Sequence, residues 1–151
     1  RMLAKFHDIG KVGISTEILN KKGPLSNSEK VEMQRHSEIG YRIAKSIPEL
    51  SGIADLILKH HERWDGKGYP LGISRTEIPL ECRIFSIIDA YDAMISKRPY
   101  KKIMNYDEIV SELRKNAGTQ FDPQLVEELL DITNSRNTPE NTTGKPQLKE
   151  V

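Results

Sequence analysis

All four histidines of this chain stand next to a carboxylate, next to each other or in a short polar segment, and each could bind a metal ion. His60 and His61 are adjacent and open the stretch HHERWDGKGYP, in which a glutamate, an aspartate and turn-forming residues follow. His7 is followed by Asp8, so this pair offers one nitrogen and one carboxylate, which can bridge two ions. His36 is the remaining histidine. Imidazole together with carboxylate suits iron, manganese or zinc rather than calcium or magnesium.

Asp89 is a further candidate ligand, because it falls inside an apolar pattern with helical spacing. A carboxylate on a buried helix face must be paired, protonated or bound to metal, since an unpaired buried charge costs many kcal/mol. A salt bridge to a core arginine is the alternative. The buried stripe expected around Asp89 consists of Ile84, Ile87, Ile88, Tyr91 and Ile95.

These residues are expected to lie on helices, because no segment alternates apolar and polar residues for long enough to predict a strand. Ser26 with Glu29, and Asn105 with Glu108, match capping boxes at helix starts. Pro79 is also typical of a helix start. The expected helices cover 1–9, 26–46 in two pieces, about 50–63, 80–96, 106–116 and 123–133, and residues 10–25 are expected to form a loop.

The composition indicates one soluble globular domain. The chain has 151 residues, of which 36% are hydrophobic and 30% charged, with a net charge of +1. No apolar run is long enough to span a membrane, and the basic residues form no long stripe that would indicate a nucleic-acid polymer as partner. The single cysteine excludes an intramolecular disulfide and fits the reducing cytoplasm. We expect a packed unit over 1–133 and a disordered tail over 134–151, which is polar.

Several motifs together resemble the HD-GYP domain, a branch of the HD superfamily of metal-dependent phosphohydrolases. The resemblance covers about 1–130 and implies an all-α fold, a helical bundle with a metal centre in its core. Family members carry a further metal-binding histidine on a helix before the HD pair, so we expect an N-terminally truncated domain that lacks its first helix or helices. The motifs are HDIGK at 7–11, QRHSEIG around His36, HHERWDGKGYP at 60–70, DAYDAM at 89–94 and RPYKK at 98–102.

The resemblance also implies roles for individual residues. It implies a di- or tri-nuclear iron or manganese centre, other divalent metals being possible, held by His7, Asp8, His36, His60, His61 and Asp89. It gives catalytic roles to Asp8, as the bridging carboxylate, and to Lys11, beside the reactive phosphate. Substrate binding is implied for Arg98, Lys101, Gly68, Tyr69 and Pro70. Taken alone, Lys11 and the basic cluster around Arg98 could equally be solvated surface residues.

The function implied is hydrolysis of cyclic di-GMP to linear pGpG or GMP, by attack of a metal-activated hydroxide on the phosphodiester. A non-catalytic module that binds a cyclic dinucleotide or a protein partner is the alternative. A third hypothesis, another HD-type phosphohydrolase acting on nucleotides, is disfavoured by the GYP loop. The family setting is bacterial signal transduction in the cytoplasm, behind an upstream receiver or sensor domain and with possible homodimerisation.

Overall fold

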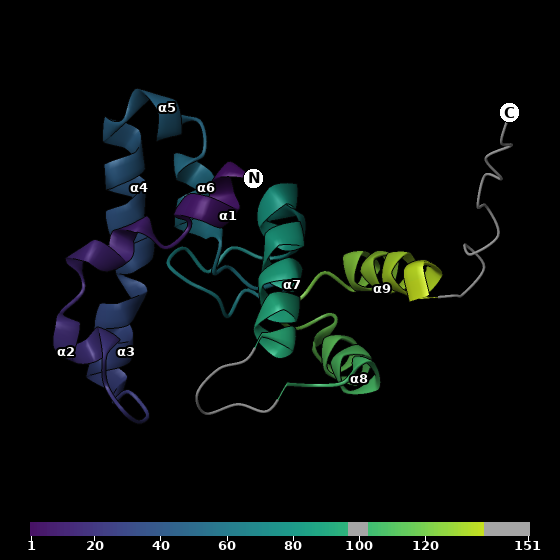
Figure 1. The fold of residues 1–151 in the computed structure, drawn as a ribbon. Coiled ribbons are helices and arrows are strands. Elements are labelled where there is room, and N and C mark those ends of the chain that lie inside the picture. The colour runs from purple at the N-terminus through teal and green to yellow at the C-terminus, as the bar shows by residue number, and fades with distance from the viewer. Residues whose placement is uncertain (97–102, 138–151) are drawn as a thin grey trace, which may run out of the picture.

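The computed structural model of this chain describes residues 1–96 and 103–137 and is built from helices. The first six helices gather on one side, α7 stands in the middle, and α8 and α9 lie on the other side (Figure 1). The helices are α1 (Met2–Phe6), α2 (Thr16–Leu19), α3 (Asn27–Gln34), α4 (His36–Ser46), α5 (Pro48–Ser51), α6 (Ala54–Lys59), α7 (Leu80–Ile95), α8 (Tyr106–Asn116) and α9 (Pro123–Asn137). Two 3-10 helices, η1 (Ile9–Gly13) and η2 (Arg75–Glu77), join them.

Local capping fixes where several helices begin. At α3, Ser26 Oγ accepts a hydrogen bond from the Glu29 amide at 3.3 Å, and Glu29 Oε2 accepts one from the Ser26 amide at 2.6 Å. The predicted box at Asn105 starts α8 in the same way. Both predictions are confirmed, and a further box at Ser74 starts η2.

Four element boundaries differ from the expectation. The helix expected over 1–9 ends at Phe6, with His7 as its C-cap. The segment expected as a loop, 10–25, contains most of η1 and all of α2, which begins where Ser15 Oγ accepts the Glu17 amide. The helix expected over 50–63 is split into α5 and α6 and ends at Lys59, so that His60 is its C-cap and His61 lies beyond it. The last helix runs four residues past 133, to Asn137, because no glycine or proline precedes Pro139.

The N-terminal core depends on close backbone approach. The helix α4 packs against both η1 and α6. A side chain at Gly10 would collide with the backbone of His36 and of Gly40, and one at Gly40 would press on the Ile57 side chain. The core residues around this contact are Leu3, Ala44, Leu50, Ala54 and Ile57. Small residues therefore bring η1 directly onto the start of α4.

The C-terminal core is apolar and made of larger side chains from α7, α8, α9 and the turn between α8 and α9: Ile87, Met94, Ile109, Leu113, Phe121, Val126 and Leu130. Arg83 of α7 ties this core to the start of α9, because its Nη1 donates to Asp122 Oδ2 at 2.7 Å. Within the part of the chain described here, no helix is long and apolar enough to cross a bilayer.

The predicted buried stripe on α7 is wrong in most of its members. Ile87 is 2% exposed, but Ile84, Ile88 and Ile95 are 40%, 50% and 42% exposed. Ile84 and Ile88 are exposed because α7 stands between two groups of helices, and these two side chains line open hollows on either side of it. One hollow of about 500 Å³ lies against α1 and α6, and one of about 220 Å³ lies against α9.

Candidate metal centre

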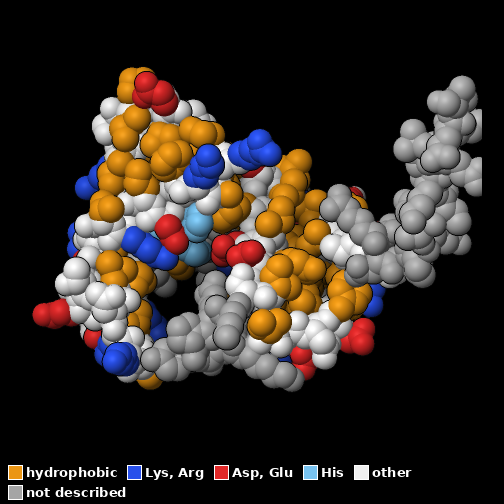
Figure 2. Space-filling view, viewed as in Figure 1, with side chains coloured by type: hydrophobic (Ala, Val, Ile, Leu, Met, Phe, Trp, Pro, Cys, Tyr) orange, Lys and Arg blue, Asp and Glu red, His pale blue; other side chains and the backbone are white. Residues whose placement is uncertain are grey.

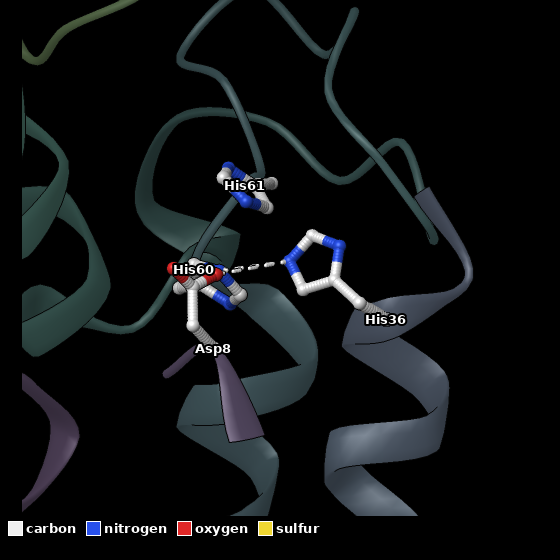
Figure 3. A group of neighbouring side chains, drawn as sticks. All are labelled: Asp8, His36, His60 and His61. Carbon is white, nitrogen blue, oxygen red and sulfur yellow. Dashed lines mark hydrogen bonds and ion pairs between the residues drawn. The ribbon is translucent and has the colours of Figure 1, made fainter. Parts of the chain in front are cut away.

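Four of the six predicted metal ligands come together. Asp8, His36, His60 and His61 each offer one ligand atom, and these atoms all lie within 4.8 Å of one another. Asp8 comes from the start of η1, His36 from the start of α4, and His60 and His61 from the end of α6 (Figure 3). His36 Nε2 lies 3.4 Å from His60 Nε2 and 3.7 Å from Asp8 Oδ1.

Three of the histidines are oriented by the same local hydrogen bond. In each, Nδ1 donates to the carbonyl of the residue three positions earlier, at the end of a helix, where the last carbonyls lack partners within the helix. In neutral His36 and His60 this bond leaves Nε2 without a proton and able to bind a metal ion, whereas Nε2 of His7 donates to Asp8. The bonds join His7 to Ala4 at 3.2 Å, His36 to Met33 at 2.7 Å and His60 to Ile57 at 2.6 Å.

His7 lies at the edge of this group. Its Nε2 is 3.2 Å from Asp8 Oδ2, and its ring meets the His60 ring edge-on at a centroid distance of 5.4 Å. Phe85 of α7 packs against the same ring at 4.9 Å. The structure therefore brings every histidine of the chain to one place, with Phe85 as an apolar wall beside them.

Asp89 lies beside the four-residue group, but not on the buried helix face that was predicted for it. It is exposed on α7 rather than buried in an apolar stripe. It reaches the site because it stands one helical turn after Phe85, on the same face. There it lines a cavity of about 210 Å³ together with His60, His61 and Glu62.

Asp8 is the charged centre of the site. Burial opposes its ionisation, but hydrogen bonds from His7 and Lys11 outweigh burial and hold its pKa well below the ordinary value. Lys11 Nζ lies 2.6 Å from Asp8 Oδ2. The hydrogen bond to Asp8 in turn raises the pKa of His7.

The other histidines are neutral at pH 7. Burial lowers the pKa of His36, brings that of His60 to about 4 and that of His61 to about 2. Metal ions bind neutral imidazole and ionised carboxylate, so these residues already have the protonation that ligands need. Two nitrogens bound to one tetrahedral ion lie ~3.3 Å apart, close to the separation of the His36 and His60 Nε2 atoms. The residues present therefore fit a metal centre.

The GYP loop wraps over this centre. A side chain at Gly68 would overlap the backbone of residues 61–63, so only glycine allows this approach. Tyr69 places its ring 4.8 Å from that of His61, and burial raises its pKa. Pro70 lines a shallow hollow beside α3 and α4.

Glu62 and Asp65, the two acidic residues of the same motif, accept hydrogen bonds from backbone amides of the loop. Glu62 Oε1 accepts the Leu71 amide at 2.7 Å, and Asp65 Oδ1 accepts the Lys67 amide at 3.1 Å. Asp65 is also paired with Arg63. Both carboxylates thus make turn hydrogen bonds.

The site opens on one face of the molecule. Figure 2 shows histidine surface exposed there between acidic and basic side chains, next to a hollow. Arg98 and Lys101, the predicted phosphate-binding residues, lie outside the described residues. Sequence reasoning missed Phe85, although its spacing from Asp89 was a signal, and it missed the contact of Gly10 with α4, for which the sequence holds none.

The chain matches known proteins over most of its length. The sequence profile of the HD domain family matches residues 2–125. A cyclic di-GMP phosphodiesterase of Thermotoga maritima is 42% identical over 131 residues, which are 85% of this chain and 36% of the relative. The cyclic di-GMP phosphodiesterase response regulator RpfG of Xanthomonas campestris is 42% identical over 99% of this chain and 37% of its own length.

Other relatives carry a different substrate in their names. A 3'3'-cGAMP-specific phosphodiesterase 2 of Vibrio cholerae is 42% identical over 83% of this chain and 24% of its own length. The crystal structure of a cyclic GMP-AMP specific phosphodiesterase of V. cholerae superposes with a TM-score of 0.58 at 20% identity, over 85% of this chain and 36% of that one. The chain thus spans about a third or less of the length of these relatives.

Proposed function

Because the chain belongs to the HD domain family, and its relatives include cyclic dinucleotide phosphodiesterases, we propose that it is a metal-dependent phosphodiesterase domain that hydrolyses cyclic di-GMP to pGpG or GMP. The observation that carries this proposal is the group formed by Asp8, His36, His60 and His61, whose ligand atoms lie within 4.8 Å of one another.

We propose that this group holds a centre of two or three iron or manganese ions. His7 and Asp89 complete it, since His7 contacts Asp8 and Asp89 lines the adjoining cavity. Bound ions would supply Lewis acidity toward the phosphodiester and a water of lowered pKa. The donor set of imidazoles and carboxylates agrees with iron, manganese or zinc.

The chain's own charged residues then act on the substrate. Asp8 stays ionised and offers two oxygens to the ions. Lys11, whose side chain is 42% exposed, can donate to a phosphoryl oxygen as negative charge develops there. Phe85 and the half-buried ring of Tyr69 limit the access of bulk water on two sides of the histidines.

Substrate binding is proposed for the residues around the mouth of the site. Tyr69 and Pro70 lie where the loop meets α3 and α4, and they offer an aromatic and an apolar surface to a nucleobase. Gly68 lets the loop approach this closely. Arg98 and Lys101 would bind the phosphates, Arg98 with two parallel hydrogen bonds.

The first test is metal content, followed by hydrolysis. Protein purified without oxygen should contain at least two equivalents of iron or manganese per chain and should cleave cyclic di-GMP. The variant Asp8→Ala should lose both. The control Asp55→Ala removes an exposed aspartate that is paired with Lys45 at 3.8 Å, and should change neither. Equal cleavage by Asp8→Ala would contradict the proposed mechanism.

A second candidate substrate is 3'3'-cGAMP, because a relative specific for it is as similar as the cyclic di-GMP enzymes are. Comparing kcat/KM for the two dinucleotides decides between them. A ratio in favour of cyclic di-GMP supports the proposal, and the opposite ratio transfers it to cGAMP. Binding of either without turnover, in metal-loaded protein, would favour a non-catalytic signalling module.

The setting of this activity is also proposed. The relatives are about three times longer than the matched region, which suits an output domain attached to a receiver or sensor and able to form homodimers. A cyclic dinucleotide made inside the cell would place the domain in the cytoplasm. The expected polar tail is wrong over 134–137, which belong to α9, and remains a prediction only beyond Asn137.

A further inference from the structure

His61 differs from the histidines beside it in how its ring is held. His36 and His60 each donate from Nδ1 to a helix carbonyl. Among the described residues, no hydrogen-bond partner is found for either ring nitrogen of His61. Its ring instead lies among three other rings, with centroid distances of 3.9 Å to His60, 5.0 Å to His36 and 4.8 Å to Tyr69. The planes of the His61 and Tyr69 rings are inclined to each other by 31°.

Tyr69 is the neighbour of His61 that comes from outside the ligand group, and the GYP loop decides where it lies. The Tyr69 amide donates to the His61 carbonyl at 3.3 Å. Gly68 sits directly on the backbone of residues 61–63. Further along, the Arg75 amide donates to the Trp64 carbonyl at 3.1 Å. The returning half of the loop therefore runs along the segment that carries His61.

The side chain of Glu62 holds the returning half of the loop against the segment that carries His61. It is 4% exposed, and its Oε1 accepts the Leu71 amide at 2.7 Å, two residues after Tyr69. A carboxylate buried to this degree is costly unless it is hydrogen-bonded, and only Oε1 has a partner among the described residues, since Oε2 is buried without one. Asp65, in contrast, bonds within its own turn, to Arg63 and Lys67. Glu62 alone of these two reaches across the loop.

We propose that Glu62 is a positioning residue: by binding the Leu71 amide it fixes the loop so that the Tyr69 ring holds the His61 imidazole toward Asp8 and His36. This stacking does for His61 what a helix carbonyl does for His36 and His60. The proposal rests on the proposed function only in giving His61 the role of a metal ligand.

The orientation of His61 can be tested in metal-free protein by NMR of the four histidine rings. Glu62→Ala should shift the His61 ring signals and leave those of His7 in place. Glu62→Gln keeps an acceptor for the Leu71 amide and should restore the wild-type signals. Tyr69→Leu should shift the same His61 signals without touching the buried carboxylate. Glu77→Ala, which removes a cap at the far end of the loop, is the matched control and should leave His61 unchanged.

Binding of Mn²⁺ alone gives the second measurement. Glu62→Ala and Tyr69→Leu should weaken it about 10–100-fold, as is usual when the residues that orient a metal ligand are lost. Glu62→Gln should stay within a few-fold of wild type. If Glu62→Ala does not fold, the NMR signals and the Mn²⁺ affinity of Tyr69→Leu and Glu62→Gln test the proposal in its place.

The two possible failures can be told apart. Wild-type protein that binds no Mn²⁺ would overturn the proposed function, while the NMR comparison would still test the positioning of His61. Unchanged His61 signals and unchanged Mn²⁺ binding in both Glu62→Ala and Tyr69→Leu would overturn the positioning role alone.

Discussion

The two cores of this molecule are packed in different ways. The N-terminal core, around Ala44, Ala54 and Ile57, joins small residues and close backbone contacts, and it buries His36 and His60 within it. The C-terminal core, around Leu113 and Phe121, consists of large apolar side chains. Small residues are needed in the first core because Asp8, at the start of η1, has to come close to the start of α4. The second core can draw its stability from buried apolar area.

The largest effect is expected in the N-terminal core, at the contact of Gly10 with α4. An alanine there would press against the backbone of α4, which cannot move aside as a side chain can. We expect Gly10→Ala to lower the free energy of unfolding by upwards of about 3 kcal/mol and to abolish metal binding. Urea unfolding followed by circular dichroism measures the first effect.

Gly52→Ala is the matched control, because nothing lies within 4 Å of the added methyl group and the backbone there is helical. It should leave stability and metal content unchanged. If Gly10→Ala behaved like this control, the close packing of η1 on α4 would not hold the site together.

In the C-terminal core, a substitution should lower the free energy of unfolding in urea without changing the binding of metal at the site. Leu113 is fully buried. Leu113→Ala should cost about 3 kcal/mol through lost burial and the cavity left behind. Metal stoichiometry at saturating metal should not change, since α8 provides none of the proposed ligands. Loss of metal binding at a temperature where the variant is still folded would contradict this independence of the two cores.

Acid should destabilise the N-terminal core first. The folded pKa of His60, about 4, and that of His61, about 2, both lie below the ordinary value of 6.5, so the unfolded chain binds more protons in this range. The free energy of unfolding of metal-free protein should therefore fall as the pH is lowered from 6.5 toward 4.5. The raised pKa of His7 acts only above 6.5, where the stability it provides is lost as the pH rises.

Urea unfolding at successive pH values, with a chelator present, measures this dependence. His61→Gln should reduce the slope between pH 6.5 and 4.5, because one of the titrating rings is gone. Identical slopes for the variant and the wild type would show that His61 is not buried in its neutral form.

The smallest expected effects come from the helix caps, and they should be equal in the N-terminal and the C-terminal parts of the molecule. Ser26→Ala and Asn105→Ala each remove the acceptor of a helix cap, at α3 and at α8. Each should cost about 1 kcal/mol in thermal or urea unfolding, and Ser26→Asp should recover most of that loss. Clearly unequal costs would mean that the two cores depend on their helix caps to different degrees.

The sequence was most informative where the signal is local. Both predicted capping boxes are present, because such a box involves residues only three positions apart. The grouping of the histidines could be anticipated because their chemistry makes them conspicuous. The end of α6 at Lys59 was missed, since no glycine or proline stops the helix there.

Features that depend on distant partners could not be predicted. Asp89 was placed near the site on the premise of a buried helix face, but whether α7 is covered depends on where α1, α6 and α9 pack. The approach of Gly10 to α4 has no periodicity that would reveal it. A turn hydrogen bond for Glu62 could be expected, but its partner, the Leu71 amide, is seen only where the loop returns nine residues later.

The bond between each Nδ1 and the carbonyl three residues earlier has a consequence for protein design. His7, His36 and His60 are each oriented by a carbonyl at the end of the helix that precedes them, and for His36 and His60 this bond also sets the tautomer. Such a helix end is a transferable unit, complete in a single short segment. A designer could build an imidazole site by converging helix C-termini on one point, and would need a supporting loop only for a ligand that, like His61, follows directly after another histidine.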